Sequence, residues 1–137
     1  MTLQTKDLRL NNLLEVDGVI IQVGKIEEKH ITWNLSKKDN LRVWNPFLPI
    51  NDERIKLINI TEEMLFKFGF KKIDHHRFKI QPSQYDWFYT YSIHDNAFRF
   101  YVEDTILCLN TIFYVHELQN LYFALVGKEL VVSDAVS

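Results

Sequence analysis

The sequence predicts an α+β fold: an N-terminal small curled β unit, a short helix, an antiparallel β-meander and a C-terminal helix packed on the sheet. Three patterns predict it. Asp17-Gly18 stands between two apolar runs, apolar and polar residues alternate over 85–93 and again over 98–103, and helical spacing runs from 115 to 127. A chain of 137 residues suits one domain over 1–137, with possible sub-units at 1–50 (the β unit) and 51–137 (the helix, sheet and C-terminal helix).

The first region reads as short strands. Asp-Gly between apolar runs is typical of a type I′ hairpin turn, since both central residues need positive φ. We expect strands on both sides of Asp17-Gly18, at His30–Trp33 and at Leu41–Trp44, with an exposed turn at 37–40. Asn45-Pro46 and Leu48-Pro49 then interrupt regular structure and are the nearest feature to a boundary.

The short helix has clear start and stop signals after an expected strand at 54–60. Thr61 is the expected N-cap, because its hydroxyl can accept from a free amide of the first turn. Glu62 and Glu63 place negative charge at the positive helix end. Gly69 should close the helix, with Phe70 folding back in a Schellman arrangement, and the expected buried face is Met64, Leu65 and Phe68.

The meander and the last helix follow. From 85 to 93 the odd positions should share one face, and Phe98, Phe100 and Val102 should return on one face with Arg99, Tyr101 and Glu103 opposite. Ile106–Leu109 is an expected last full strand, and 130–132 an expected edge strand. In the C-terminal helix the predicted buried face is Val115, Leu118, Tyr122 and Leu125, and Gly127 is the predicted closing residue.

Composition excludes several classes of function. Sixteen basic against eighteen acidic side chains give a formal net charge of −2, which argues against a dedicated duplex-DNA binder. The single cysteine, Cys108, cannot form an internal disulfide and is expected to be a small buried side chain. We find no signal segment and no run of the ~20 apolar residues that a membrane span needs. We therefore expect a cytoplasmic protein with no membrane partner.

No motif for catalysis or cofactor binding is present. The chain has no GxGxxG, Walker, GxSxG or CxxC pattern, so we expect no enzyme activity, no cofactor and no catalytic residue. His75 and His76 would point to opposite faces if they lie on a strand, so we expect no metal site. A general base at His116, beside Glu117, is an alternative that would require an active site assembled from distant residues.

Basic residues are locally in excess between 67 and 79, just before an aromatic strand with Trp87, Phe88, Tyr89 and Tyr91. Basic side chains beside exposed aromatic rings suit single-stranded RNA or DNA, because bases stack and phosphates pair with cations. The other account is a basic solvent-exposed face on a sheet whose aromatic residues are core. The candidate contact residues for a partner or nucleic acid are Lys71, Lys72, His75, His76, Arg77 and Lys79.

Three segments, Leu10–Gly18, Ile60–Phe70 and Tyr114–Leu125, resemble a family of bacterial and prophage proteins that has no assigned activity. The similarity spans most of the chain, and its two helical signatures are fairly specific. The matching residues are mostly caps and core, so the resemblance implies a shared fold. It implies no catalytic residues.

The resemblance to proteins of mobile elements shapes the functional expectation. Small phage proteins without catalytic machinery often block a host protein, as inhibitors of CRISPR nucleases do. We expect a non-enzymatic binding protein, an anti-CRISPR-like inhibitor of a host defence nuclease or nucleoprotein, with a host protein or nucleoprotein as partner. The alternatives are a single-stranded RNA- or DNA-binding module and a structural role in a virion or oligomer.

Overall fold

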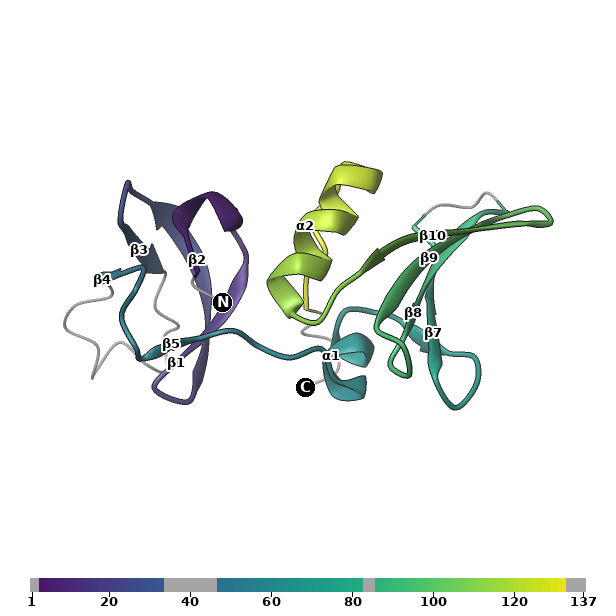
Figure 1. The fold of residues 1–137 in the computed structure, drawn as a ribbon, viewed down its shortest axis with the longest axis horizontal. Coiled ribbons are helices and arrows are strands. Elements are labelled where there is room, and N and C mark those ends of the chain that lie inside the picture. The colour runs from purple at the N-terminus through teal and green to yellow at the C-terminus, as the bar shows by residue number, and fades with distance from the viewer. Residues whose placement is uncertain (1–2, 34–46, 83–85, 133–137) are drawn as a thin grey trace. The chain divides into compact units, whose positions relative to one another are not determined.

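The computed structural model describes residues 3–33, 47–82 and 86–132 and has an α+β fold (Figure 1). The chain divides into two compact units, Met1–Ile58 and Asn59–Ser137. The first unit contains a curled antiparallel sheet. The second contains another antiparallel sheet and two helices, one of them C-terminal.

The sheet of the first unit has five strands in the order β4-β3-β2-β1-β5. A short 3-10 helix, η1 (Thr5–Asp7), precedes them. The strands are β1 (Leu13–Val16), β2 (Val19–Ile26), β3 (His30–Trp33), β4 (Phe47–Pro49) and β5 (Ile55–Lys56). Eight buried apolar side chains form its core: Leu8, Leu14, Val16, Ile21, Val23, Ile31, Trp33 and Leu48.

The hairpin turn between β1 and β2 is confirmed, because Asp17 has φ 51° and Gly18 has φ 82°. The expected strand at 54–60 is mostly wrong, since only Ile55 and Lys56 pair as a strand and Asn59 forms an isolated bridge with Tyr114. The turn expected at 37–40 and the strand expected at Leu41–Trp44 lie outside the described residues.

Helix α1 (Glu62–Lys67) begins and ends as the sequence predicts. The Met64 amide donates to the Thr61 hydroxyl over 3.2 Å, which satisfies one free donor of the first turn. Gly69 has φ 94°, and the amides of Gly69 and Phe70 donate to the carbonyls of Phe66 and Leu65. These two bonds are the Schellman pattern, so the predicted closure is confirmed.

The sheet of the second unit has the strand order β10-β9-β8-β7-β6. Its strands are β6 (Lys71–Lys72), β7 (Arg77–Ile80), β8 (Phe88–Ser92), β9 (Ala97–Val102) and β10 (Thr105–Thr111). Both helices lie on one side of this sheet (Figure 1). We call that side the inner face. The strand residues that point to it are Phe78, Ile80, Tyr89, Tyr91, Phe98, Phe100 and Leu107.

Helix α2 (Val115–Val126) ends at Gly127, whose φ of 79° is left-handed as predicted. Val115, Leu118 and Tyr122 are buried, but Leu125 is 42% exposed, so the predicted apolar face is one turn too long. Gln119, which is not part of the predicted apolar face, is buried, with its Nε2 donating to the Leu130 carbonyl over 3.5 Å. The strand expected at 130–132 is wrong, because Leu130 is buried outside any strand.

Neither helix in the described part of the chain has the length and apolar character required to cross a membrane.

Candidate functional site

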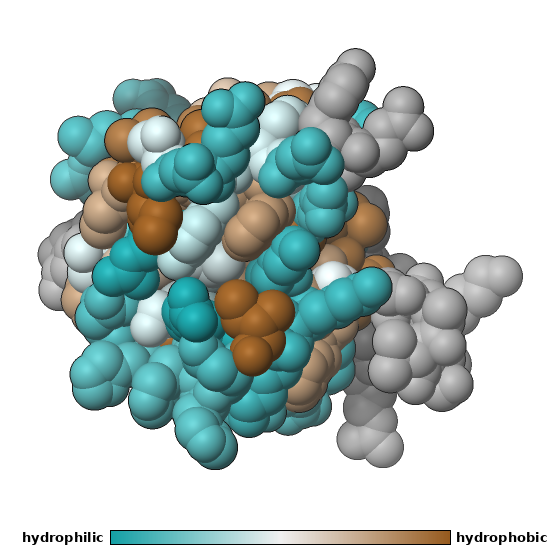
Figure 2. Space-filling model, turned by 90° about the vertical axis from the view of Figure 1, so that its right-hand side faces the viewer, coloured by the Kyte–Doolittle hydropathy of each residue, from teal (hydrophilic) through white to brown (hydrophobic). Residues whose placement is uncertain are grey.

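The sheet face turned away from the helices carries a cluster of cations and aromatic rings. Residues paired directly across an antiparallel sheet point to the same side. The pairs Lys71–Lys79, Lys79–Thr90, Thr90–Arg99 and Phe88–Tyr101 therefore define one surface. We call it the outer face and define it by Lys71, Arg77, Lys79, Phe88, Arg99 and Tyr101. Figure 2 shows the molecule from this side, with hydrophilic side chains surrounding paler and more apolar ones.

Two aromatic rings lie next to each other on the outer face, at the start of β8 and near the end of β9. The rings of Phe88 and Tyr101 stack, with centroids 4.9 Å apart and planes within 7° of parallel. The Lys79 ammonium lies 4.2 Å from the Phe88 centroid, within the range of a cation–π contact. Both rings are only half-buried. The arrangement is a partly exposed pair of stacked rings, which we call the platform, with the Lys79 ammonium over the Phe88 ring.

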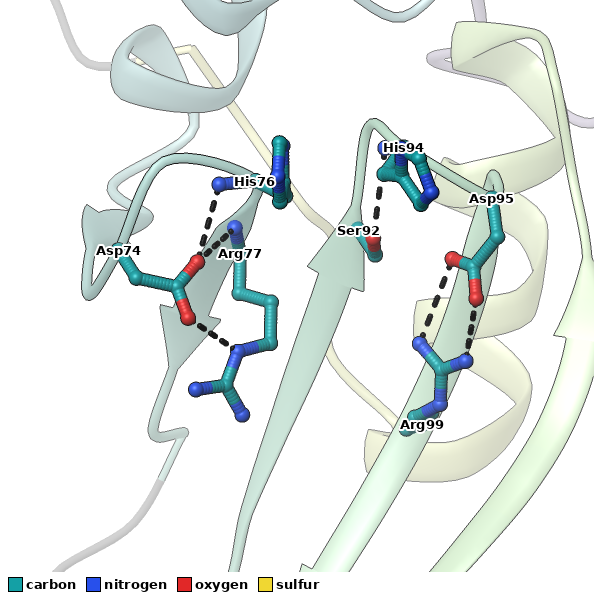
Figure 3. A network of polar contacts seen from close by, with 7 residues as sticks. All are labelled: Asp74, His76, Arg77, Ser92, His94, Asp95 and Arg99. Carbon is teal, nitrogen blue, oxygen red and sulfur yellow. Dashed lines mark hydrogen bonds and ion pairs between the residues drawn. The ribbon is translucent and has the colours of Figure 1, made fainter.

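Two arginines of the outer face are held by carboxylates (Figure 3). Arg77 Nε lies 2.6 Å from Asp74 Oδ2, and Arg99 Nη2 lies 2.5 Å from Asp95 Oδ2. Hydrogen bonds lower the pKa of Asp74 to about 2, and the bond donated by the His76 amide contributes more than the bond from Arg77. The hydrogen bond from Arg99 lowers the pKa of Asp95 to about 2. Part of the positive charge of this face is therefore neutralised within the protein.

The structure brings three of the six predicted contact residues together and separates the others. Lys71, Arg77 and Lys79 share the outer face. Lys72 points to the opposite side, because it pairs with the inward-pointing Phe78. Its Nζ lies 3.1 Å from Glu62 of α1 and 5.8 Å from the centroid of the Phe78 ring. Alternation along the two-residue strand β6 explains this split.

The histidines lie at one end of the sheet. His75 and His76 occupy the bend before β7, so placing them on a strand was wrong. The His76 ring lies against His94, with centroids 4.9 Å apart, and both side chains are exposed (Figure 3). Across the described ranges, no three His, Cys, Asp or Glu side chains are grouped as a metal ion would require.

One expectation about a reactive group needs correction. His116 lies in the first turn of α2, near the start of the predicted helix, and is only 3% exposed. Cys108 was expected to be buried, and this was wrong because the side chain is exposed. It lies on β10 at the edge of the sheet, where no further described strand covers it. An apolar run in a strand does not reveal whether the strand is central or at an edge.

Sequence reasoning assigned no functional role to Arg99 or Tyr101. Their signal was the alternation along β9, which puts both residues opposite the apolar Phe98 and Phe100. What the sequence lacked was the strand register. Only the pairing of Phe88 with Tyr101 shows that their rings meet.

No protein-family model, no curated protein and no solved structure matches this chain. The resemblance to a family of bacterial and prophage proteins therefore stays a prediction. So does the expectation of an inhibitor of a host defence nuclease.

Proposed function

We propose that the outer face of the second sheet binds single-stranded nucleic acid, RNA or DNA, without catalysis. The observation that carries the proposal is the stacked Phe88–Tyr101 pair with the Lys79 ammonium beside it. A base can stack on a half-buried ring while its phosphate approaches a lysine, and base–aromatic stacking contributes ~1–3 kcal/mol per base. Both contacts are available here on neighbouring strands.

The charge of the face favours a single strand over a duplex. Duplex binders gain most of their affinity by neutralising phosphates. Here Arg77 and Arg99 are paired with Asp74 and Asp95, and the whole chain carries a formal charge of −2. Lys71 and Lys79 take part in none of the ion pairs found among the described residues. Two lysines and a stacking platform suit a few unpaired nucleotides.

The experiment is a titration of fluorescently labelled poly-pyrimidine oligonucleotides followed by anisotropy, over a series of salt concentrations. We expect binding that weakens with salt, with a log–log slope of about −1.4 if two phosphates are contacted. Tyr101→Ala should weaken binding by about tenfold, since ~1–3 kcal/mol of stacking is lost per base. Phe113→Ala is the matched control, because Phe113 is a 50% exposed aromatic residue outside the outer face.

The same titration separates this proposal from the inhibitor predicted from the sequence. An inhibitor that docks on a host nuclease needs no affinity for a free oligonucleotide. Absence of binding to both RNA and DNA oligonucleotides at low salt would overturn the nucleic-acid proposal. Binding that Tyr101→Ala and Phe113→Ala weaken equally would overturn the outer face as its site.

A further inference from the structure

The four sheet edges in the described residues differ sharply in length and chemistry. Natural proteins protect exposed edges with short strands, lysines and prolines. β5 has two residues, β4 has three and ends in Pro49, and β6 consists of Lys71 and Lys72 alone. β10 differs from all three, because it has seven residues and contains neither a charged residue nor a proline. It is the edge on which a further strand can pair.

β10 also exposes apolar side chains on both of its faces. Ile106 is 58% exposed and pairs with Tyr101 of the outer face. Leu107 is 48% exposed and pairs with Phe100 of the inner face. An added strand would bond the free backbone groups of the edge and cover these two side chains at the same time.

We infer that β10 pairs in antiparallel orientation with β10 of a second copy of this chain, centred on Leu107. Charge favours the second copy as occupant. In this register Leu107 lies opposite Leu107 and Ile106 opposite Cys108, so the uncharged residues meet each other. Asp104 lies opposite Asn110 and Glu103 opposite Thr111, so no two carboxylates are opposed. A parallel copy in identical register would align Asp104 with Asp104, which is destabilising.

The pairing of β10 with β9 supports this centre. The β9–β10 register shifts between Cys108 and Asn110, which marks an irregularity at Leu109. Thr105–Cys108 remain in continuous register with β9. A centre at Leu107 uses this regular segment and leaves the irregular residue near the end of the paired region. Because antiparallel pairing uses the same surface on both copies, the assembly closes as a dimer.

The dimer is independent of the proposed function but would enlarge its surface. A two-fold axis perpendicular to the sheet joins the two five-stranded sheets edge to edge. Both outer faces then lie on the same side. A dimer could therefore form without nucleic-acid binding, and each property fails or holds in its own experiment.

Sedimentation velocity of the full chain, from micromolar to near-millimolar concentration and without nucleic acid, tests the inference. We expect a monomer–dimer equilibrium for the unaltered chain. Leu107→Lys and Leu107→Glu should each weaken dimerisation by at least about tenfold, because they place like charges opposite each other. An equimolar mixture of the two variants should dimerise again. Ile20→Lys is the matched control, since Ile20 is a 47% exposed apolar residue of the first sheet.

A second measurement fixes the register without relying on charged variants. Leu107→Cys combined with Cys108→Ser should cross-link under a mild thiol oxidant, whereas the natural Cys108 faces Ile106 and should cross-link much less. Circular dichroism checks that each variant is folded. An unaltered chain that stays monomeric throughout overturns the inference. So does a dimer that Leu107→Lys leaves unchanged, or a mixture of variants that does not dimerise.

Discussion

The two faces of the second sheet are formed by the same strands, but the inner face is part of the core and the outer face is partly exposed. On the inner face Phe78 and Phe98 are fully buried, and Tyr91 is 1% exposed. On the outer face the Phe88 and Tyr101 rings stack but remain half-buried. Aromatic residues are thus used in two ways within one sheet. Those facing the helices form the core, and those facing away offer a surface.

The largest expected effect comes from deleting a ring on the inner face. Phe98→Ala should lower the free energy of unfolding by ~3–5 kcal/mol, because it leaves a cavity at a fully buried site. Chemical denaturation followed by circular dichroism measures this loss. Tyr101→Ala, in the same strand but on the outer face, should cost only ~0.2–1 kcal/mol, the value of a cross-strand pair. Equal losses of unfolding free energy for the two variants would contradict a difference in stability contribution between the two faces.

A smaller effect is expected at the Tyr91 hydroxyl. This buried group donates to the Ile112 carbonyl, 2.8 Å away, with Asn96 Oδ1 at 3.1 Å, and burial raises the pKa of Tyr91 to about 12. Tyr91→Phe should cost ~0.5–1.5 kcal/mol in unfolding free energy, because a buried hydrogen bond is lost and the Ile112 carbonyl loses a donor. Tyr91→Phe should lower the melting temperature more than Tyr89→Phe does, because no hydrogen bond of the Tyr89 hydroxyl is found among the described residues.

Much of the fold could be predicted from the sequence where it depends on local patterns. Thr61 and Gly69 mark the ends of α1 by capping chemistry, and Asp17-Gly18 fixes a turn by its positive φ values. Alternation along β8 and β9 correctly separated Tyr89, Tyr91 and Phe98 from the outward positions. These features need no knowledge of distant partners.

The candidate site could be predicted only in part, because it depends on register and strand order. The excess of basic residues pointed to Lys71, Arg77 and Lys79, but it could not exclude Lys72, whose direction depends on the exact start of β6. Tyr101 meets Phe88 only through the pairing of β8 with β9. Cys108 is exposed because β10 lies at an edge, and edge position is a property of the whole sheet.

The lysines allow a matched test of the two faces. Lys79→Ala should weaken oligonucleotide binding severalfold and reduce the magnitude of the salt slope by ~0.7, the value for one phosphate contact on a single strand. Lys72→Ala should leave both quantities unchanged, because Lys72 lies on the inner side and pairs with Glu62. Anisotropy titrations at several salt concentrations give both numbers. A larger effect of Lys72→Ala than of Lys79→Ala would contradict a phosphate contact on the outer face.

The smallest expected effect is the response of the outer face to acid. Asp95 is held by Arg99, which lowers its pKa from 3.8 to about 2 in the folded chain. A lowered pKa means that this carboxylate stabilises the fold above its ordinary pKa, and that the contribution is lost as the pH falls from about 4 to about 2. Because the pair is partly exposed, with side-chain exposures of 25% for Arg99 and 43% for Asp95, solvent screens much of this contribution.

Asp95→Asn tests this titration. It should lower the melting temperature slightly at neutral pH and flatten its fall between pH 4 and 2, since the variant has no carboxylate to protonate there. Asp52→Asn is the control, because Arg54 lowers the pKa of Asp52 to about 2 and Asp52 belongs to the first unit, not to the outer face. Asp95→Asn should also release Arg99 for a phosphate and strengthen oligonucleotide binding, whereas Asp52→Asn should not. Stronger binding with both variants would point to net charge as the cause and not to the outer face.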